Sequence, residues 1–384
     1  MGAGFITATA ADGIRQSTNK AYLIPVANRK NLKIIKKALA TKILINDNSI
    51  AYGVEIEKDG ETMTFYVSRE VILSAGTINS PQLLMLSGVG PKEHLLSNNV
   101  TCIVDSPMVG QNLQEHTIMP IPIFADVPEE QTTAEQYLGA ISYLADRQGY
   151  LAENSASSGA VAFFSTIDNA TYPNCENQLS IIPKNYSTLD DTLTSIFRYN
   201  ETVRNSITEL NKDHALYFIL FTLLHPYSRG NISLNSNNPK DYPLIYPNYF
   251  EDSRDFDTAV KGIKMDTKIV NTTYFKSINA FLGRINLPAC NNFEVDSEDY
   301  WKCIATNLVT TGYHPVGTCS MGPNINTSVV DSRLKVHSVK NLRVIDASVM
   351  PNTTSGNINA PCIMIGERGS ELIKQDYNEA INEI

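Results

Sequence analysis

The sequence predicts a mixed α/β and α+β fold in two domains, one inserted into the other. Between Leu32 and Ala75, short runs rich in β-branched and aromatic residues alternate with turn residues. The apolar run Val71–Leu73 leads into Ala75, Gly76 and a helical pattern, and a buried strand followed by a helix returns after residue 340. The chain has 384 residues, of which 42% are hydrophobic, which is enough for about two domains.

The first region is expected to form a sheet with at least one hairpin. Residues 46–48 and 58–60 supply turn chemistry between the runs. Ser80 is predicted to cap a helix whose first residue is Pro81, because a proline there loses no helical hydrogen bond. The expected strands are 32–36, 42–45, 51–56, 62–67 and 70–75.

The pattern changes between about residues 118 and 305, which predicts an inserted α/β domain. Strands are expected at 160–164 and 215–224. Helices are expected near 133–145, 191–210 and 253–269. The buried-strand and helix pattern then resumes at 341–345 and 359–374. The predicted domains are therefore 1–117, 118–305 and 306–384, the last returning to the first.

Composition excludes several classes of function. The net charge of −9 and the pI near 5.2 indicate no basic surface for nucleic acid or an anionic membrane, and favour a small neutral or cationic substrate. No apolar run approaches the ~18 residues of a membrane span. The first residues lack the basic and apolar regions of a signal peptide, so we expect no export signal in this chain.

The six cysteines lack zinc-type spacing, so no metal site is expected. Cys290 and Cys303 could close a short disulfide loop in an oxidising compartment or remain two half-buried thiols, and the sequence leaves both readings open. Eight Asn-X-Ser/Thr sequons favour secretion without settling it. They begin at Asn99, Asn169, Asn185, Asn200, Asn231, Asn271, Asn326 and Asn352.

His314 and Asn357 are the candidate catalytic residues. An imidazole titrates near neutral pH and can remove a proton, whereas an amide near a helix start can stabilise negative charge. A lone histidine is equally explained as a core or surface residue, and Asn357 as the N-cap of the following helix. The other five histidines, His116 among them, are expected to serve structure or surface.

The sequence contains five blocks in the order Ala75–Gly90, Val109–His116, His314–Gly322, Val329–Asp331 and Leu342–Pro351. Together these blocks resemble the glucose-methanol-choline (GMC) flavoprotein oxidoreductases. Cys290, Cys303 and Trp301, together with the run Gly356–Pro361, most resemble the insect branch of glucose dehydrogenase-like and ecdysone oxidase-like proteins.

The resemblance implies an FAD-binding Rossmann-like domain, formed by 1–117 and 306–384, and a substrate-binding domain at 118–305 with a largely antiparallel sheet and helices. The GxGxxG turn that seats the ADP part of FAD in this family is missing. Gly2 and Gly4 lack a third glycine and a preceding strand. The chain is therefore expected to correspond to the C-terminal two thirds of such an enzyme, with an incomplete FAD-binding domain.

The resemblance also implies an FAD-dependent oxidoreductase acting on the CH–OH group of donors. His314 would take the hydroxyl proton while a hydride passes to flavin N5, and Asn357 would hold the developing alkoxide. The substrate would be an alcohol, sugar or sterol, the electron acceptor a quinone or oxygen, and the full-length location extracellular or in the secretory pathway. The implied cofactor-binding residues are Ala40, Ala75, Gly76, Tyr313, Asp346, Ala347, Asn357, Asn359 and Ala360.

Two departures from the family pattern predict a shifted loop over the site: Glu115 replaces an aspartate, and Met108 replaces a common glycine. Asp346 has a simpler reading as a turn or cap residue. The alternative function is a truncated or degenerate relative that cannot hold FAD and is not an enzyme. A serine hydrolase is set aside because no GxSxG turn accompanies His314.

Overall fold

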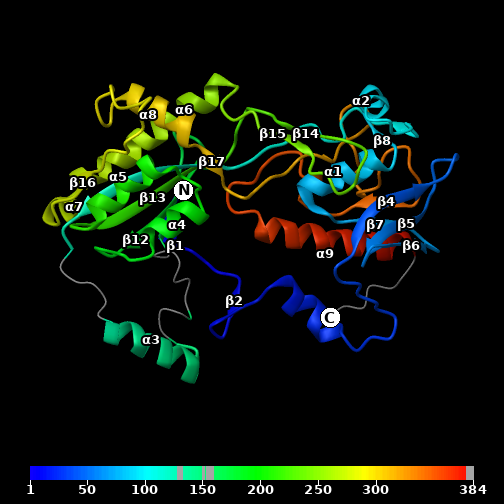
Figure 1. Cartoon of the computed structure of the whole chain (residues 1–384), viewed down its shortest axis with the longest axis horizontal. Helices are drawn as coiled ribbons and strands as arrows, with labels where there is room; N and C mark the ends of the chain where they lie inside the picture. The colour runs from blue at the N-terminus through cyan, green and yellow to red at the C-terminus, as the bar shows by residue number, and fades with distance from the viewer. Residues whose placement is uncertain (128–132, 149–151, 153–159, 378–384) are drawn as a thin grey trace. The chain divides into compact units, whose positions relative to one another are not determined.

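The computed structural model describes residues 1–127, 133–148, 152 and 160–377 (Figure 1). They form two compact units. The first comprises Met1–Arg29, Thr117–Leu224 and Asp252–Gly312, and the second comprises Lys30–His116, His225–Glu251 and Tyr313–Ile384.

Two segments group differently from the predicted domain bounds. Residues 1–29 belong to the first unit because strand β1 (Gly2–Phe5) pairs there with β11 (Ala160–Phe164). Residues 225–251 belong to the second unit, where Leu113 exchanges backbone hydrogen bonds with Gly230. Pairing between distant segments decides both placements, and a local pattern does not encode it.

The first unit is built on an antiparallel sheet, which confirms the predicted sheet type. Its strand order in the described residues is β1-β11-β12-β13-β10-β16, with β17 also paired to β10. The predicted strands 160–164 and 215–224 are confirmed as β11 and β13. The other strands are β10 (Thr117–Ala125), β12 (Cys175–Ile182), β13 (Ala215–Leu223), β16 (Phe281–Leu282) and β17 (Thr310–Thr311).

Strand β10 contains Pro120 and Pro122, although it has partners on both edges. Strand β13 pairs along its whole length. On the other edge, β17 pairs only with residues 117–118 and β16 only with 123–124. The prolines lie between these two short partners, the part of an edge where a residue without an N–H is tolerated.

Helices α3 (Thr133–Asp146) and α6 (Ser253–Asp266) lie near the predicted ranges 133–145 and 253–269, whereas α7 (Thr273–Ser277) and α8 (Glu298–Leu308) were not predicted. The single helix predicted at 191–210 is wrong. Arg198 adopts a left-handed φ of 53°, which interrupts the helix, and the Asn200 side chain then accepts a hydrogen bond from Val203 N to cap a second one. The remaining elements are β2 (Ala10–Ala11), β3 (Ile14–Arg15), η1 (Asn19–Leu23), η2 (Ile24–Val26), α4 (Leu189–Ser195), α5 (Glu201–Asn211) and η3 (Thr267–Asn271).

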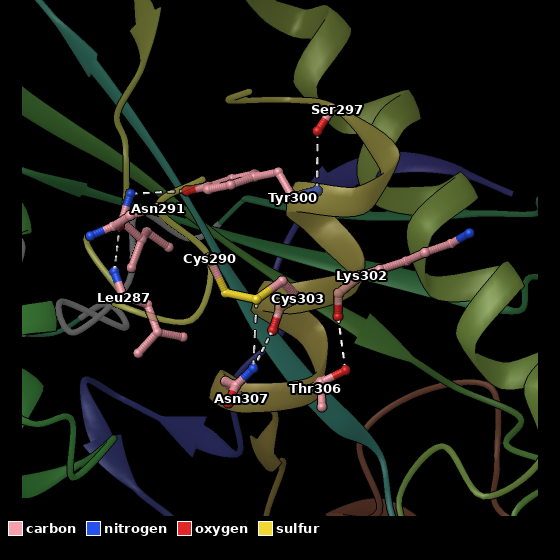
Figure 2. The surroundings of a disulfide bond; sticks show 10 residues. Leu287, Cys290, Asn291, Ser297, Tyr300, Lys302, Cys303, Thr306 and Asn307 are labelled. Atoms are coloured by element: carbon pink, nitrogen blue, oxygen red, sulfur yellow. Dashed lines mark hydrogen bonds between the residues drawn. A yellow bond between two sulfur atoms is a disulfide. The ribbon is translucent and has the colours of Figure 1, made fainter. Parts of the chain in front are cut away.

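Cys290 and Cys303 form a disulfide bond in the first unit (Figure 2). Their Cα atoms are 5.6 Å apart, and the bond joins helix α8 to the loop before it. Ser297 caps α8 by accepting a hydrogen bond from Tyr300 N, and the Tyr300 hydroxyl accepts one from Ile285 N. Of the two readings that the sequence left open, the structure contains the disulfide.

The second unit combines several small sheets around one core. A three-stranded antiparallel sheet, β4-β5-β6, lies beside a parallel pair, β7-β18, and two further pairs, β8-β9 and β14-β15. The strands are β4 (Leu39–Ile45), β5 (Ala51–Lys58), β6 (Glu61–Tyr66), β7 (Val71–Leu73), β8 (Val89–Gly90), β9 (Val104–Asp105), β14 (Asn231–Ser233), β15 (Leu244–Tyr246) and β18 (Leu342–Val344). The helices are α1 (Gly76–Leu86), α2 (Lys92–Ser97), η4 (Ala347–Val349) and α9 (Asn359–Asp376).

The strand predicted at 32–36 is wrong. Leu32 and Ile34 are 37% and 50% exposed, and no described strand pairs with this segment. Its isoleucines have strand propensity, but without a partner the backbone hydrogen bonds of a strand cannot form.

Helix α1 begins at Gly76, so the predicted start at Pro81 is also wrong. Pro81 lies inside the helix and has no N–H to donate to the carbonyl oxygen of Thr77. The hydroxyl of Thr318 donates to that oxygen instead, over 2.6 Å in the buried interior. The Thr77 hydroxyl in turn donates to Pro315 O at 2.7 Å. The same proline that marks a helix start in sequence is therefore accommodated by a distant side chain.

Candidate active site

Two of the sequence blocks run antiparallel beside each other in the second unit. Gln114 and Val316 exchange both backbone hydrogen bonds, and Gly110 N donates to Thr318 O. The approach requires Gly317, which has a φ of 99°, because a Cβ there would lie 2.2 Å from Asn112 O. This register places His116 opposite His314.

The two imidazoles contact each other directly. The Nδ1 atoms of His116 and His314 are 3.0 Å apart, and the rings meet edge to face with centroids 5.1 Å apart. His116 is fully buried, and its Nε2 lies 3.0 Å from Thr354 O. His116 therefore contacts the candidate base directly, which its sequence context did not predict.

Two features define the backbone around His314: a hydrogen bond from its N–H and the conformation of the residue before it. Glu115 is 7% exposed, and its Oε1 accepts a hydrogen bond from His314 N at 2.7 Å. Tyr313, the preceding residue, has a left-handed φ of 60°, uncommon for a residue with a side chain, and is 64% exposed. The residue that departs from the family pattern thus contacts the candidate base directly.

His314 is half-buried, and this burial lowers the pKa of its imidazole below the usual value. A lowered pKa increases the neutral fraction near pH 7. Neutral imidazole is the form that can accept a proton, so the environment suits a general base.

The loop that carries Asn357 is tied to the same segment. Pro351 O accepts hydrogen bonds from the side chains of Asn112 and Gln114, at 3.2 and 2.9 Å. Thr354, the carbonyl partner of His116, donates its hydroxyl to Gly356 O at 3.0 Å. Asn357 itself is exposed and directly follows this anchored stretch. The structure thus joins the loops of both predicted catalytic residues through His116.

Helix α9 begins beside this loop without a side-chain cap. Its N-cap is Ile358, so Asn357 does not occupy the cap position. Asn359 and Ala360 are exposed in the first turn. An 18-residue helix with such an N-terminus offers backbone N–H groups and the positive end of its dipole to an anionic group.

The side chain of Asp346 is engaged inside the protein. Its Oδ2 accepts from Gly76 N at 2.9 Å and Ser80 Oγ at 2.6 Å, and its Oδ1 accepts from Ser348 N at 2.8 Å. It therefore caps η4 and joins the end of β18 to the start of α1. This geometry leaves backbone groups near Asp346 and buried Ala347 as the means of touching a ligand.

The remaining predicted cofactor residues are accessible. Ala75 is exposed, and Gly76 has a φ of 83° with open space where a Cβ would project. Ala40 is exposed on β4, opposite Ile56 of β5. Backbone surfaces of this kind suit close approach by a flat or anionic ligand, so the residues present fit the implied cofactor.

Sequence reasoning missed His116 and Glu115 as parts of the site. Glu115 was noted only as a departure from the family pattern, and His116 only as a structural or surface residue. A usable signal was present: the block Val109–His116 ends in a histidine and the block at 314 begins with one, so antiparallel pairing of the two brings these ends together.

Among the described helices, none combines the length and the apolar composition needed to cross a bilayer. Within the same part of the chain, no three or more histidine, cysteine or acidic side chains gather as a metal-binding group would.

The histidine pair and the start of α9, whose N-cap residue makes no side-chain cap, lie in the same unit. Two family profiles, both described as GMC oxidoreductase, match residues 1–118 and 226–366, more than half of the chain together. The chain belongs to the GMC oxidoreductase family, as its sequence blocks predicted.

Individual relatives agree with this assignment. Ecdysone oxidase of Bombyx mori is 41% identical over 98% of this chain and 55% of that protein. Glucose dehydrogenase [FAD, quinone] of Drosophila melanogaster is 34% identical over 99% of this chain and 59% of that protein. Among solved structures, a formate oxidase of Aspergillus oryzae matches with a TM-score of 0.79 at 25% identity, covering 98% of this chain and 66% of that one. The chain spans less than two thirds of the length of these relatives.

Proposed function

We propose that this protein is an FAD-dependent oxidoreductase that oxidises the CH–OH group of its donor. The observation that carries the proposal is the environment of His314, whose pKa is lowered by burial and whose ring is held by His116. A neutral imidazole fixed in this way can take the hydroxyl proton of an alcohol. When bound, the flavin supplies the acceptor for the hydride.

The residues that would hold FAD come from five places in the second unit. The uncapped start of α9, with Asn359 and Ala360, would face an electron-rich or anionic part of the cofactor. The open turn at Ala75 and Gly76 and the turn at Asp346 and Ala347 would contact it through backbone groups. Ala40 and Tyr313 complete the proposed set, and Asn357 would donate its amide to the substrate oxygen.

The names of two relatives support a proposal for the substrate class. One relative is called an ecdysone oxidase and another a glucose dehydrogenase that uses FAD and quinone. We therefore propose an alcohol, sugar or sterol as substrate and a quinone or oxygen as electron acceptor.

The proposed location is extracellular or within the secretory pathway. The disulfide between Cys290 and Cys303 is the kind of bond that persists in an oxidising compartment. Seven of the eight sequon asparagines are exposed, and Asn231, within β14, is half-buried. A shift in mass after treatment of the secreted protein with a glycosidase specific for N-linked glycans would test this part.

A second candidate, a relative that cannot hold FAD, rests on the parallel sheet. Among the described residues this sheet has only the strands β7 and β18, and Ile72 on it is 38% exposed. The sequence also contains no GxGxxG turn to seat the ADP part of the cofactor.

A spectrum and a reduction assay separate the two candidates. The chain is purified with added FAD, and bound flavin is measured from its visible absorbance. The first candidate predicts near-stoichiometric flavin and its anaerobic bleaching by a sugar, sterol or simple alcohol. Replacement of His314 with Ala should leave the flavin bound and slow the bleaching about 100-fold or more. Preparations that remain colourless would favour the second candidate.

A further inference from the structure

The hydrogen bonds of His116 determine which of its nitrogens carries the proton. Thr354 O is a carbonyl oxygen and can only accept, so His116 Nε2, 3.0 Å away, must be the donor. His116 is fully buried, and a buried charge is unfavourable unless it is paired. In the neutral ring, one proton on Nε2 leaves Nδ1 as an acceptor.

The same reasoning extends to His314. Its Nδ1 lies 3.0 Å from Nδ1 of His116, and two acceptors at that distance would not form a hydrogen bond. His314 Nδ1 must therefore carry a proton and donate it. A neutral His314 then has its lone pair on Nε2, the nitrogen that remains to act as a base.

We propose that His116 is a positioning residue that fixes the tautomer of His314, so that Nε2 is held unprotonated for the substrate hydroxyl. This inference rests on the proposed function of His314 as the base. Free histidine side chains have no such constraint, and a proton on Nε2 would make the ring unable to accept another there.

His116 also sets the position of the ring relative to the Asn357 loop. The chain of contacts runs from His314 through His116 to Thr354, whose hydroxyl donates to Gly356 O, the residue before Asn357. The base and the loop of the proposed alkoxide-binding amide are thereby held by one imidazole. A ring that moves would alter both groups together.

Glu115 contacts the pair through the backbone: its Oε1 accepts a hydrogen bond from His314 N. This hydrogen bond does not involve the ring of His116. Substitutions of His116 therefore test the tautomer separately from the position of the backbone.

Three variants of the flavin-loaded protein test the proposal. His116→Phe keeps a ring but removes both nitrogens, and should slow flavin reduction about 100-fold with little change in KM. His116→Gln can offer an oxygen to His314 and an N–H to Thr354, and should recover most of the rate. His337→Phe is the matched control, because His337 also places Nε2 near a carbonyl, that of Gly322, but lies outside this chain of contacts. It should leave the rate unchanged.

The ring nitrogens of His314 provide a readout that does not depend on catalysis. Nitrogen NMR of protein labelled in its histidine rings, assigned by loss of signals in His314→Ala, should show Nδ1 protonated and Nε2 unprotonated at pH 8. In His116→Phe the proton should move to Nε2, whereas His116→Gln should keep the original pattern. The pH profile of flavin reduction should change in His116→Phe and not in His337→Phe.

The outcomes separate this inference from the proposed function. If His314 carries its proton on Nε2 in the unmodified protein, the inference is wrong even for an active enzyme. If the NMR pattern is as expected but His314→Ala reduces flavin at the original rate, the pairing stands and the assignment of the base fails. Equal rates for His116→Phe and His337→Phe would also overturn the positioning role.

Discussion

Two sets of buried ionisable groups, one in each unit, are accommodated in opposite ways. In the second unit, Arg343 is 1% exposed, and its guanidinium donates to Glu70 and Asp376 over 2.7 and 2.5 Å. In the first unit, Asp266 and Glu176 accept hydrogen bonds from the amides of Asn177 and Gln178, and no cation of the described residues forms an ion pair with them. A buried charge is thus compensated by opposite charge in one unit and by a shift toward the neutral form in the other.

The pKa shifts express this difference. Burial alone would lower the pKa of Arg343, but the hydrogen bonds and charges of Glu70 and Asp376 raise it. Lys335 and Arg343 hold the pKa of Asp376 well below its usual value. Burial instead raises the pKa of Asp266 to about 7, although its hydrogen bond from Asn177 opposes the change. The partners available to a group, more than the burial itself, decide its protonation state.

The largest effect is expected from breaking the paired charge. Arg343→Met leaves the carboxylate of Glu70, with a 7% exposed side chain, without its cation. The free energy of unfolding, measured with urea, should fall by about 3–5 kcal/mol. Lys212→Met is the control, because Lys212 and Glu209 form an exposed pair and should contribute no more than about 1 kcal/mol. Equal losses in the two variants would show that Arg343 is not stabilised by its partners.

A somewhat smaller loss is expected when the disulfide of the first unit is removed. The bond closes a loop with a sequence separation of 13, and replacing both Cys290 and Cys303 with Ser should lower the free energy of unfolding by about 3 kcal/mol. Reductant should lower the free energy of unfolding of the unmodified protein by a similar amount and leave that of the double variant unchanged. The disulfide would be contradicted if reductant left the free energy of unfolding unchanged and mass spectrometry showed both thiols to be free.

The pH dependence of the two units should have opposite signs. Because the folded pKa of Asp266 is raised, its contribution is complete below about pH 4 and is lost as the pH rises through about 7. The depressed pKa of Asp376 gives a contribution that is present above about pH 4 and lost below it. Asp266→Asn should flatten the loss between about pH 4 and 7, which we expect to be about 2–4 kcal/mol. An unchanged slope in Asp266→Asn would assign the dependence to another group.

The smallest effect is expected at Glu176, which is 1% exposed and whose pKa is raised by burial. Glu176→Gln removes the option of charge while keeping the shape of the side chain. Above pH 7 the variant should be more stable than the original by about 1 kcal/mol, since no buried acid can ionise. The advantage should shrink at pH 5, and a loss of stability at both pH values would indicate that the carboxylate has a favourable partner.

Much of the fold followed from local pattern. The strands β5, β6, β11 and β13 and the helix α9 lie close to the residues predicted for them. Their hydrophobic periodicity reflects which side of each element meets the core, and that information is contained in the element itself. Among the predictions that failed are the helix start at Pro81 and the strand at 32–36. Pro81 lies inside a helix because the distant Thr318 hydroxyl donates the hydrogen bond that a local N–H would supply, and the strand predicted at 32–36 has no partner strand among the described residues.

The candidate site was predicted in part for the same reason. His314 and Asn357 stand in family blocks and could be named from sequence, whereas their assignment as catalytic residues stays a prediction. His116 could not be given its place, because its contact with His314 spans 198 residues of sequence and depends on the pairing of Gln114 with Val316.

The sequence by itself determined the family, some of the strands and helices in their order, and which residue types could do the chemistry. Tertiary structure alone decided the disulfide, the hydroxyl that compensates for Pro81, and the imidazole that contacts His314. The physical reason is the distance along the sequence over which each interaction acts. Periodicity and capping act over a few residues, whereas hydrogen-bond partners and protonation states depend on groups that folding brings together from distant parts of the chain.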